Sequence, residues 1–190
     1  MKLQSVITVG MVLGISVLSG CAAKHGRQQQ HQPLLEVPQV TASLRVPDGQ
    51  ILTLETKATG VQIYECGVDK GDDTKFAWNF KAPEADLYDT HGKQTGQKIG
   101  KHYGGPTWEG DDGSKVVGQV RASENSPDAS AISWLLLRAQ SNSGSGIFAK
   151  TASIQRLNTS GGKAPADGCD QAHLGKIARV PYTAQYYFYN

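Results

Sequence analysis

The stretch "GKHYGGPTWEGDDGSKVVGQV", residues 100–120, alternates tight turns with short apolar runs. Residues 104–106, Gly-Gly-Pro, predict a turn, because glycine permits positive φ values and proline restricts φ. Residues 107–109 then fit a short strand, and the Asp-Gly pair at 112–113 favours a second turn before the valines that follow. The stretch therefore predicts turn, strand, turn, strand, which is typical of an antiparallel meander.

The same pattern continues over most of the chain. Glycine makes up 22 of the 190 residues, about 12% against a usual 7%, which favours many turns and short strands. Near the end, alternation places Tyr182, Ala184, Tyr186 and Phe188 on one face of a strand. Further strands are expected at residues 42–46, 50–55, 60–66, 75–80, 85–89, 114–122 and 146–158. These features predict an all-β single domain over residues 41–190, a barrel or sandwich of about eight to ten short strands with long, turn-rich loops.

Residues 128–139 fit two structures. Ile132, Leu135, Leu136 and Ala139 recur at helical spacing, with Asp128 placed to cap the helix. As a strand, the same apolar run would be buried on both faces. The glycine-rich neighbourhood favours the strand, and the sequence leaves both interpretations open.

Residues 1–20 have the pattern of a bacterial lipoprotein signal peptide. Lys2 precedes an apolar run over residues 6–18, which is short for a membrane span. "LSGC", residues 18–21, then resembles a lipobox, in which Cys21 receives the lipid. The alternative is an ordinary secretory signal with an accidental cysteine.

Residues 21–40 are mostly polar with two prolines and predict a flexible tether between lipid and domain. The residue after Cys21 is Ala22 rather than Asp, which favours the outer membrane over the inner one. We therefore expect a protein of the cell envelope, lipid-anchored at the outer membrane and facing the periplasm. Its contact with the membrane would be made through the N-terminal lipid.

Two cysteines remain once Cys21 is acylated, namely Cys66 and Cys169. An even pair in an oxidising compartment favours a disulfide. The rival interpretations are a reactive thiol and a metal ligand, but neither cysteine has a second cysteine at the spacing of a zinc site. The sequence predicts no metal site.

The opening stretch also holds the candidate functional residues. An exposed aromatic pair could stack on glycan, and nearby polar groups could bind its hydroxyls. A carboxylate with a histidine could serve as acid and base, but no G-x-S-x-G motif accompanies them. The EF-hand calcium spacing is absent. The candidate ligand surface comprises His102, Tyr103, Trp108, Glu109, Asp111 and Asp112.

Other activities find no support in the sequence. Without residues 1–20 the chain has 18 basic and 17 acidic residues, a balance that gives no reason to expect nucleic acid. Gly161-Gly162-Lys163 is followed by Ala, which breaks the phosphate-loop pattern, and no G-x-G-x-x-G motif occurs. We expect no cofactor, and the sequence does not predict the oligomeric state.

Several segments together resemble the family catalogued as domain of unknown function 3455, found in bacterial and fungal secreted proteins. The resemblance covers roughly residues 42–190, and Cys66 and Cys169 both lie within its motifs, which supports their pairing. The residue before Trp134 is commonly proline in that family and is Ser133 here. No established activity comes with the resemblance. The segments are "GVQIYEC", "WNFKAPEADLYD", "GKHYGGPTWEGDDGSKVVG", "AISWLLLRA", "IQRLNTSGGKAPADGCD" and "VPYTAQYYFYN".

The leading hypothesis is a non-enzymatic binding or structural module that contacts glycan or another envelope protein. The alternative is a hydrolytic enzyme that uses carboxylates and a histidine around residues 84–112. Carboxylates converging with His102 in one cleft would favour the enzyme, and an exposed aromatic patch would favour binding.

Overall fold

The computed structural model describes Met1, residues 35–92 and residues 94–190. Cys21, the expected signal peptide and most of the expected tether lie outside the described residues. The strands are β1 (Leu52–Val68), β2 (Phe76–Asp89), β3 (Lys98–Tyr103), β4 (Thr107–Gly110), β5 (Lys115–Glu124), β6 (Trp134–Ser143), β7 (Ser153–Gly161) and β8 (Ile177–Tyr189).

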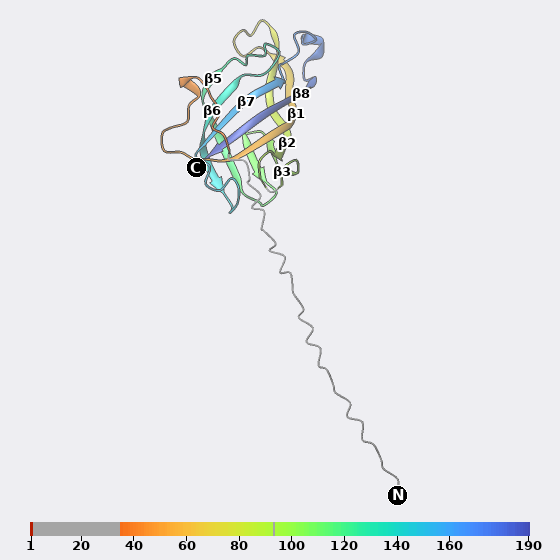
Figure 1. Cartoon of the computed structure of the whole chain (residues 1–190). Helices are drawn as coiled ribbons and strands as arrows, with labels where there is room; N and C mark the ends of the chain where they lie inside the picture. Colours follow the sequence, from red (N-terminus) through yellow and green to blue (C-terminus); the bar gives the residue numbers. More distant parts are fainter. Residues whose placement is uncertain (2–34, 93) are drawn as a thin grey trace. The chain divides into compact units, whose positions relative to one another are not determined.

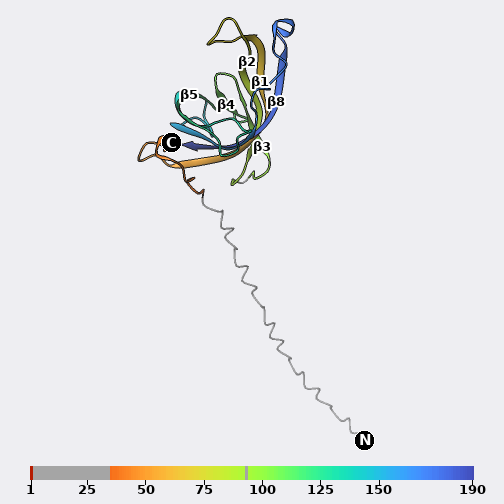
Figure 2. The same cartoon turned by 90° about the horizontal axis from the view of Figure 1, so that it is seen from above.

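The eight strands form one closed antiparallel barrel, in which each strand pairs with the next and β8 pairs with β1. The β1–β8 ladder runs from Leu52 opposite Tyr189 to Glu65 opposite Ile177. Figures 1 and 2 show these two strands curving side by side. The prediction of an all-β barrel or sandwich is confirmed, and the barrel is the form observed.

Helical structure in the described residues consists of two short 3-10 turns, η1 (Ala42–Leu44) and η2 (Gln171–His173). The described part of the chain therefore contains no helix that is long and apolar enough to span a bilayer.

Alternation along the strands builds two apolar clusters, one on each face of the sheet. The inner cluster fills the barrel and includes Tyr182, Ala184, Tyr186 and Phe188, so the face predicted for β8 is confirmed. The intervening β8 residues Tyr187 and Tyr189 belong to the outer cluster, which leaves the last part of β8 buried on both sides.

The outer cluster is covered by residues 35–51, which we call the outer segment. Its side chains Leu35, Val40, Leu44 and Val46 pack against residues of β5 to β8. Gln155 Nε2 donates a 2.7 Å hydrogen bond to the Leu44 carbonyl. Leu35 and Val40 fall within the range expected to be a tether, and both contact the barrel.

The strand expected at residues 42–46 is wrong, because these residues form η1 and an extended stretch of the outer segment. The two strands expected at residues 75–80 and 85–89 are one strand, β2, which begins at Phe76. Of residues 146–158, only those from Ser153 onward lie in a strand. The strand interpretation of residues 128–139 is confirmed from Trp134 onward.

The two predicted turns of the opening stretch are present. Gly105 separates β3 from β4 with φ +125°, and Gly113 separates β4 from β5 with φ +80°. Both values lie in the region that glycine adopts without strain.

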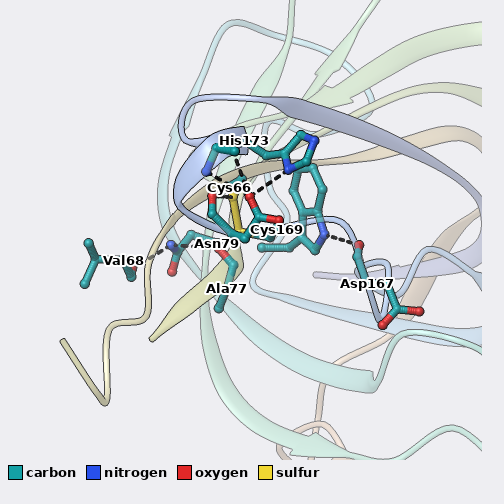
Figure 3. Close-up of a disulfide and its surroundings, with 10 residues drawn as sticks. Cys66, Val68, Ala77, Asn79, Asp167, Cys169 and His173 are labelled. Carbon is teal, nitrogen blue, oxygen red and sulfur yellow. Dashed lines mark hydrogen bonds and ion pairs between the residues drawn. A yellow bond between two sulfur atoms is a disulfide. The ribbon is translucent and has the colours of Figure 1, made fainter. Parts of the chain in front are cut away.

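The predicted disulfide is confirmed. It joins Cys66 near the end of β1 to Cys169 in the loop before β8, as Figure 3 shows. The Trp78 indole also fastens this loop, since Nε1 donates a 2.9 Å hydrogen bond to the Asp167 carbonyl. The β7–β8 loop is thus held to the β1–β2 hairpin by a covalent bond and by hydrogen bonds, which include two backbone bonds at Cys66.

Candidate binding site in the barrel

Strand alternation divides the predicted ligand surface between two faces of the sheet. His102 and Trp108 are 2% and 1% exposed and lie inside the barrel. Tyr103 and Glu109 occupy the opposite face, where the Tyr103 hydroxyl donates a 2.6 Å hydrogen bond to Glu109 Oε2. The structure therefore does not bring the aromatic residues together on one exposed patch.

Glu109 lies at the centre of a charged cluster on the outer face. Lys101 is its register partner on β3, and Lys115 is its register partner on β5. The Lys115 Nζ lies 3.2 Å from Glu109 Oε2, and the Lys101 Nζ lies 3.5 Å from Oε1. The hydrogen bond from Tyr103, followed by that from Lys115, holds the pKa of Glu109 below its usual range. These contacts are cross-strand pairs that support the sheet.

Asp112 serves the backbone of the turn it belongs to. Its Oδ1 accepts hydrogen bonds from the Ser114 backbone N–H and hydroxyl, and its Oδ2 accepts one from the Ile147 N–H. Burial raises the pKa of Asp112, but these hydrogen bonds outweigh it and hold the pKa below its usual value. Asp112 thus ties the β4–β5 turn to the β6–β7 loop, and Asp111 beside it is exposed.

His102 and Trp108 form a stacked pair inside the barrel. They are register partners on β3 and β4, and their ring centroids lie 4.4 Å apart at 15° between planes. His102 Nδ1 lies 2.8 Å from the Thr107 carbonyl oxygen. Because a carbonyl only accepts, Nδ1 carries the proton and Nε2 is left as an acceptor. Burial lowers the pKa of His102 to about 3, so the ring is neutral at physiological pH.

A cavity of about 210 Å³ opens beside this pair. It lies at the end of the barrel that holds the β3–β4 turn and the start of β6. Its walls are mostly apolar, and no carboxylate is among them. The lining residues are Phe80, Lys81, Pro83, His102, Gly104, Gly105, Pro106, Trp108, Val120, Leu135, Leu137, Arg156 and Tyr186. We call this cavity the barrel pocket.

Arg156 brings a positive charge into the barrel pocket. It lies on β7, two residues from the fully buried Ile154 of the inner cluster. Its Nε and Nη2 donate hydrogen bonds of 3.1 and 2.8 Å to the Ser133 carbonyl. Among the ion pairs of residues 35–92 and 94–190, none includes Arg156.

Tyr186 adds an uncommitted hydroxyl. The residue is 1% exposed, and its Oη has no partner at normal hydrogen-bond distance in the described part of the chain, although the Tyr182 hydroxyl and the Arg156 guanidinium lie close enough to lower its pKa. Burial raises the pKa of Tyr186, and the nearby charge of Arg156 opposes that rise. Buried hydroxyl groups without partners are uncommon in folded proteins. The barrel pocket therefore contains a cation, a phenol and a neutral imidazole within apolar walls.

The opposite end of the barrel holds a wide depression of about 1000 Å³. Its lining includes Glu55, Asp89, His91, Asp111 and Asp112. The Asp89 carboxylate accepts hydrogen bonds from three backbone N–H groups of the β2–β3 loop, so it caps that loop. No group of three or more potential ligands is placed to hold a metal ion, as far as the described residues go.

Glu55 and His91 form the one acid–histidine pair in that depression that the described residues show. Glu55 Oε2 lies 3.1 Å from His91 Nδ1, and the Glu55 side chain is 6% exposed. Burial raises the pKa of Glu55, and His91 opposes that rise. The pair lies at the other end of the barrel from the pocket lined by His102.

Arg156 and Tyr186 are pocket residues that do not belong to the ligand surface predicted from the sequence. A signal was present for Arg156, because period-two alternation in "SIQRLN" puts Ile154 and Arg156 on one face. A charged residue on the apolar face of a strand is unusual unless it is paired or functional. Tyr186 lies on the face that the alternation predicts, and the alternation does not indicate that its hydroxyl belongs to a site.

Comparison with known proteins places the chain in one family. Residues 47–190 match the family model described as "Protein of unknown function (DUF3455)". No curated protein and no solved structure matches the chain. Since the match covers the whole barrel and most of the chain, the protein belongs to the DUF3455 family.

Proposed function

We propose that this protein is a lipid-anchored, non-enzymatic binding module of the cell envelope that holds a small molecule in the barrel pocket. The observation that carries the proposal is the cavity itself, with apolar walls around polar groups that lack partners. An eight-stranded barrel is about wide enough to hold one small ligand among its inner side chains. Specific small-molecule sites combine these same elements.

The position of the aromatic rings decides the kind of ligand. Trp108 is buried beside the pocket, so it would contact a molecule that enters the barrel rather than a polymer lying on the surface. A glycan chain or an envelope protein would instead meet the outer face, where Tyr103 is engaged with Glu109. A small ligand therefore suits the interior better than the glycan first considered.

The hydrolytic alternative gains no support from the barrel pocket. His102 has no carboxylate beside it there, and its low pKa leaves it protonated on Nδ1 alone. Glu109 faces the outside of the sheet. The proposed role is therefore binding without turnover.

Ligand binding can be tested with a pocket-blocking variant. Val120 lines the mouth of the barrel pocket and is 48% exposed, so Val120→Trp should narrow the entrance at little cost in stability. Val68 is also 48% exposed and lies outside the pocket lining, which makes Val68→Trp the matched control.

We expect calorimetric titration with a panel of neutral and charged single-ring and short alkyl compounds to detect binding to the unaltered protein. Val120→Trp should abolish that binding, and Val68→Trp should retain it. The proposal fails if no compound binds, or if binding survives in Val120→Trp.

The lipid anchor rests on "LSGC" and is tested separately. Cys21→Ser should release the protein into the soluble periplasmic fraction or leave it as an uncleaved precursor, because the thiol that receives lipid is gone. Membrane fractionation and mass spectrometry of the N-terminus measure both outcomes. Normal processing and membrane attachment of Cys21→Ser would refute the anchor.

A further inference from the structure

We propose that the ligand of the barrel pocket carries a carboxylate on a small apolar body, and that Arg156 binds this carboxylate. The inference rests on the proposed binding function and names its ligand class. It depends on the charge of the pocket, on the groups that remain uncommitted, and on the volume and walls of the cavity.

The charge of the pocket is unbalanced. Arg156 is half-buried, and the lining contains no acidic residue to pair with it. Lys81 at the rim is exposed and already paired with Glu65, whose Oε2 lies 2.6 Å from the Lys81 Nζ, so the unpaired charge of the lining is that of Arg156. A cation next to apolar walls is unfavourable without a partner, so an anionic ligand group would supply what the described chain does not.

The geometry of Arg156 favours a carboxylate. The two hydrogen bonds to the Ser133 carbonyl hold the guanidinium in place, and the Tyr186 hydroxyl is the neighbour of its remaining N–H groups in the described part of the chain. A planar guanidinium matches the two oxygens of a carboxylate. The unpartnered Tyr186 hydroxyl provides a further donor. One guanidinium suits a single negative charge better than the two charges of a phosphate monoester.

His102 shapes the remainder of the ligand site. Its neutral ring offers Nε2 as an acceptor, so it does not compete with Arg156 for the anion. A hydroxyl or amine on the ligand body could donate to this nitrogen. The imidazole therefore tolerates polar substituents away from the carboxylate.

The size of the pocket limits the ligand body. An engineered apolar cavity of about 150 Å³ holds a benzene ring, so the barrel pocket of about 210 Å³ has room for one ring or a short alkyl chain. Phe80 and Val120 at its mouth are 49% and 48% exposed. This apolar rim would cover the part of a longer chain that extends beyond the pocket.

Benzoate and benzamide provide the sharpest test, because they have the same shape and differ in charge. We expect calorimetric titration to show benzoate binding at least about tenfold more tightly than benzamide, since hydrogen bonds between charged groups contribute more than neutral ones. Decanoate in a third titration distinguishes an alkyl chain from a ring. Tighter binding of either carboxylate than of benzamide supports the inference.

Arg156→Gln should reduce benzoate affinity by about ten- to a hundredfold and leave benzamide affinity within about threefold. Arg138 is the matched control, because its guanidinium is exposed and bonds to Gln119 on the outer face. Arg138→Gln should bind benzoate like the unaltered protein. Tyr186→Phe removes only the hydroxyl and should weaken benzoate several-fold, which tests the site even if Arg156→Gln fails to fold.

The inference and the proposed function fail in different ways. If benzamide and other neutral compounds bind as tightly as the carboxylates, the pocket is a binding site but the carboxylate assignment is wrong. Unchanged benzoate affinity in both Arg156→Gln and Tyr186→Phe would also overturn the assignment. If no member of either panel binds, both proposals are wrong.

Discussion

His102 illustrates at the residue scale how the barrel separates side chains that are neighbours in sequence. In the chain it stands beside Tyr103 and close to Glu109, which suggested a shared site. In the barrel it points inward onto Trp108, whereas Tyr103 and Glu109 meet on the outer face. Burial lowers the pKa of His102 and keeps its ring neutral. The hydrogen bond to the Thr107 carbonyl holds the remaining ring proton on Nδ1.

The buried His102 should make the protein acid-sensitive. Its pKa is about 3 in the folded protein, against about 6.5 in an unfolded chain. Between these values the unfolded chain binds a proton that the folded protein does not, so stability falls as the pH falls from about 6.5. The contribution of His102 to the pH dependence of the free energy of unfolding approaches about 1.4 kcal/mol per pH unit. Chemical denaturation at intervals from pH 8 to pH 4 measures the slope.

His102→Phe keeps a ring against Trp108 and removes the titrating group, so it should lack this part of the slope. Val68→Trp is a suitable control, because Val68 is 48% exposed and the change alters no titrating group, so this variant should retain the slope of the unaltered protein. Equal slopes for all three proteins would show that His102 is not the origin of the acid sensitivity.

Trp108 should contribute far more to stability than the carboxylates beside it. Trp108 is 1% exposed and also contacts the rings of Tyr186 and Phe188, so Trp108→Ala should cost about 3–5 kcal/mol. Glu109→Gln and Asp111→Asn should each cost well under about 1 kcal/mol, because both lie on the surface. Thermal melts rank the variants, and a small effect of Trp108→Ala would contradict its structural role.

At the element scale, the alternation of side chains predicted strands well and boundaries less well. The assignment of four alternating β8 residues to one face is confirmed, because all of them belong to the inner cluster: Tyr182, Ala184, Tyr186 and Phe188. Residues 42–46 also alternate, but their apolar side chains pack flat onto the outside of the barrel, and no partner strand lies beside them. Alternation reports which side is buried and does not reveal whether a neighbouring strand exists.

Pro83 lies in β2 between the two strands expected at residues 75–80 and 85–89. A proline inside a central strand removes a ladder hydrogen bond. In the structure β3 pairs with β2 only from Glu84 onward, so Pro83 lies where β2 has β1 alone as its neighbour. The same gap between β2 and the β3–β4 turn borders the barrel pocket, whose lining includes Pro83 and Gly104.

Gly60 should be essential for the close approach of β1 and β2. A Cβ atom there would lie 2.1 Å from the Glu84 carbonyl oxygen and 2.5 Å from the Ala85 Cα, and backbone atoms cannot move aside easily. Gly60→Ala should therefore cost at least about 1–3 kcal/mol. At Gly67 on the same strand, the nearest atom is the side-chain Nδ2 of Asn79 at 3.1 Å, so Gly67→Ala is the control and should have a smaller effect.

Denaturant unfolding of both glycine variants gives the comparison directly. We expect a clear difference in midpoint between the two variants, with Gly60→Ala the less stable protein. Comparable midpoints would mean that β1 and β2 can shift apart at this position without loss.

At the scale of the whole molecule, the sequence indicated the fold class but not the order of the strands. Short turns favour pairing of neighbouring strands, which the meander from β1 to β8 bears out. Closure between β1 and β8 depends on the curvature of the complete sheet, which no local pattern reports. The barrel pocket was missed for a similar reason, since His102 comes from β3 and meets Arg156 and Tyr186 of the last two strands only when the sheet closes.

The disulfide should stabilise the whole barrel. Cys66 and Cys169 are 103 residues apart, and the chain-entropy model gives about 4–5 kcal/mol for a loop of about 100 residues as an upper figure. Reduction, or the double change Cys66→Ala with Cys169→Ala, should lower the thermal midpoint measured by calorimetry. In the oxidised protein both cysteines should resist alkylation, because they become thiols only when reductant is added. Free thiols in protein isolated without reductant would contradict the pairing.

The pairing of β1 with β8 also means that β1 is synthesised well before the strand that pairs with one of its edges. The last residue of β8 leaves the ribosome 121 residues after the last residue of β1, taking Val68 and Tyr189 as the ends. At about 5–20 residues per second this corresponds to about 6–24 seconds. Throughout that interval β1 has an unpaired edge, which is prone to join other extended chains. A chaperone that recognises exposed strands would therefore have a target on the nascent chain that disappears once the last strand is added.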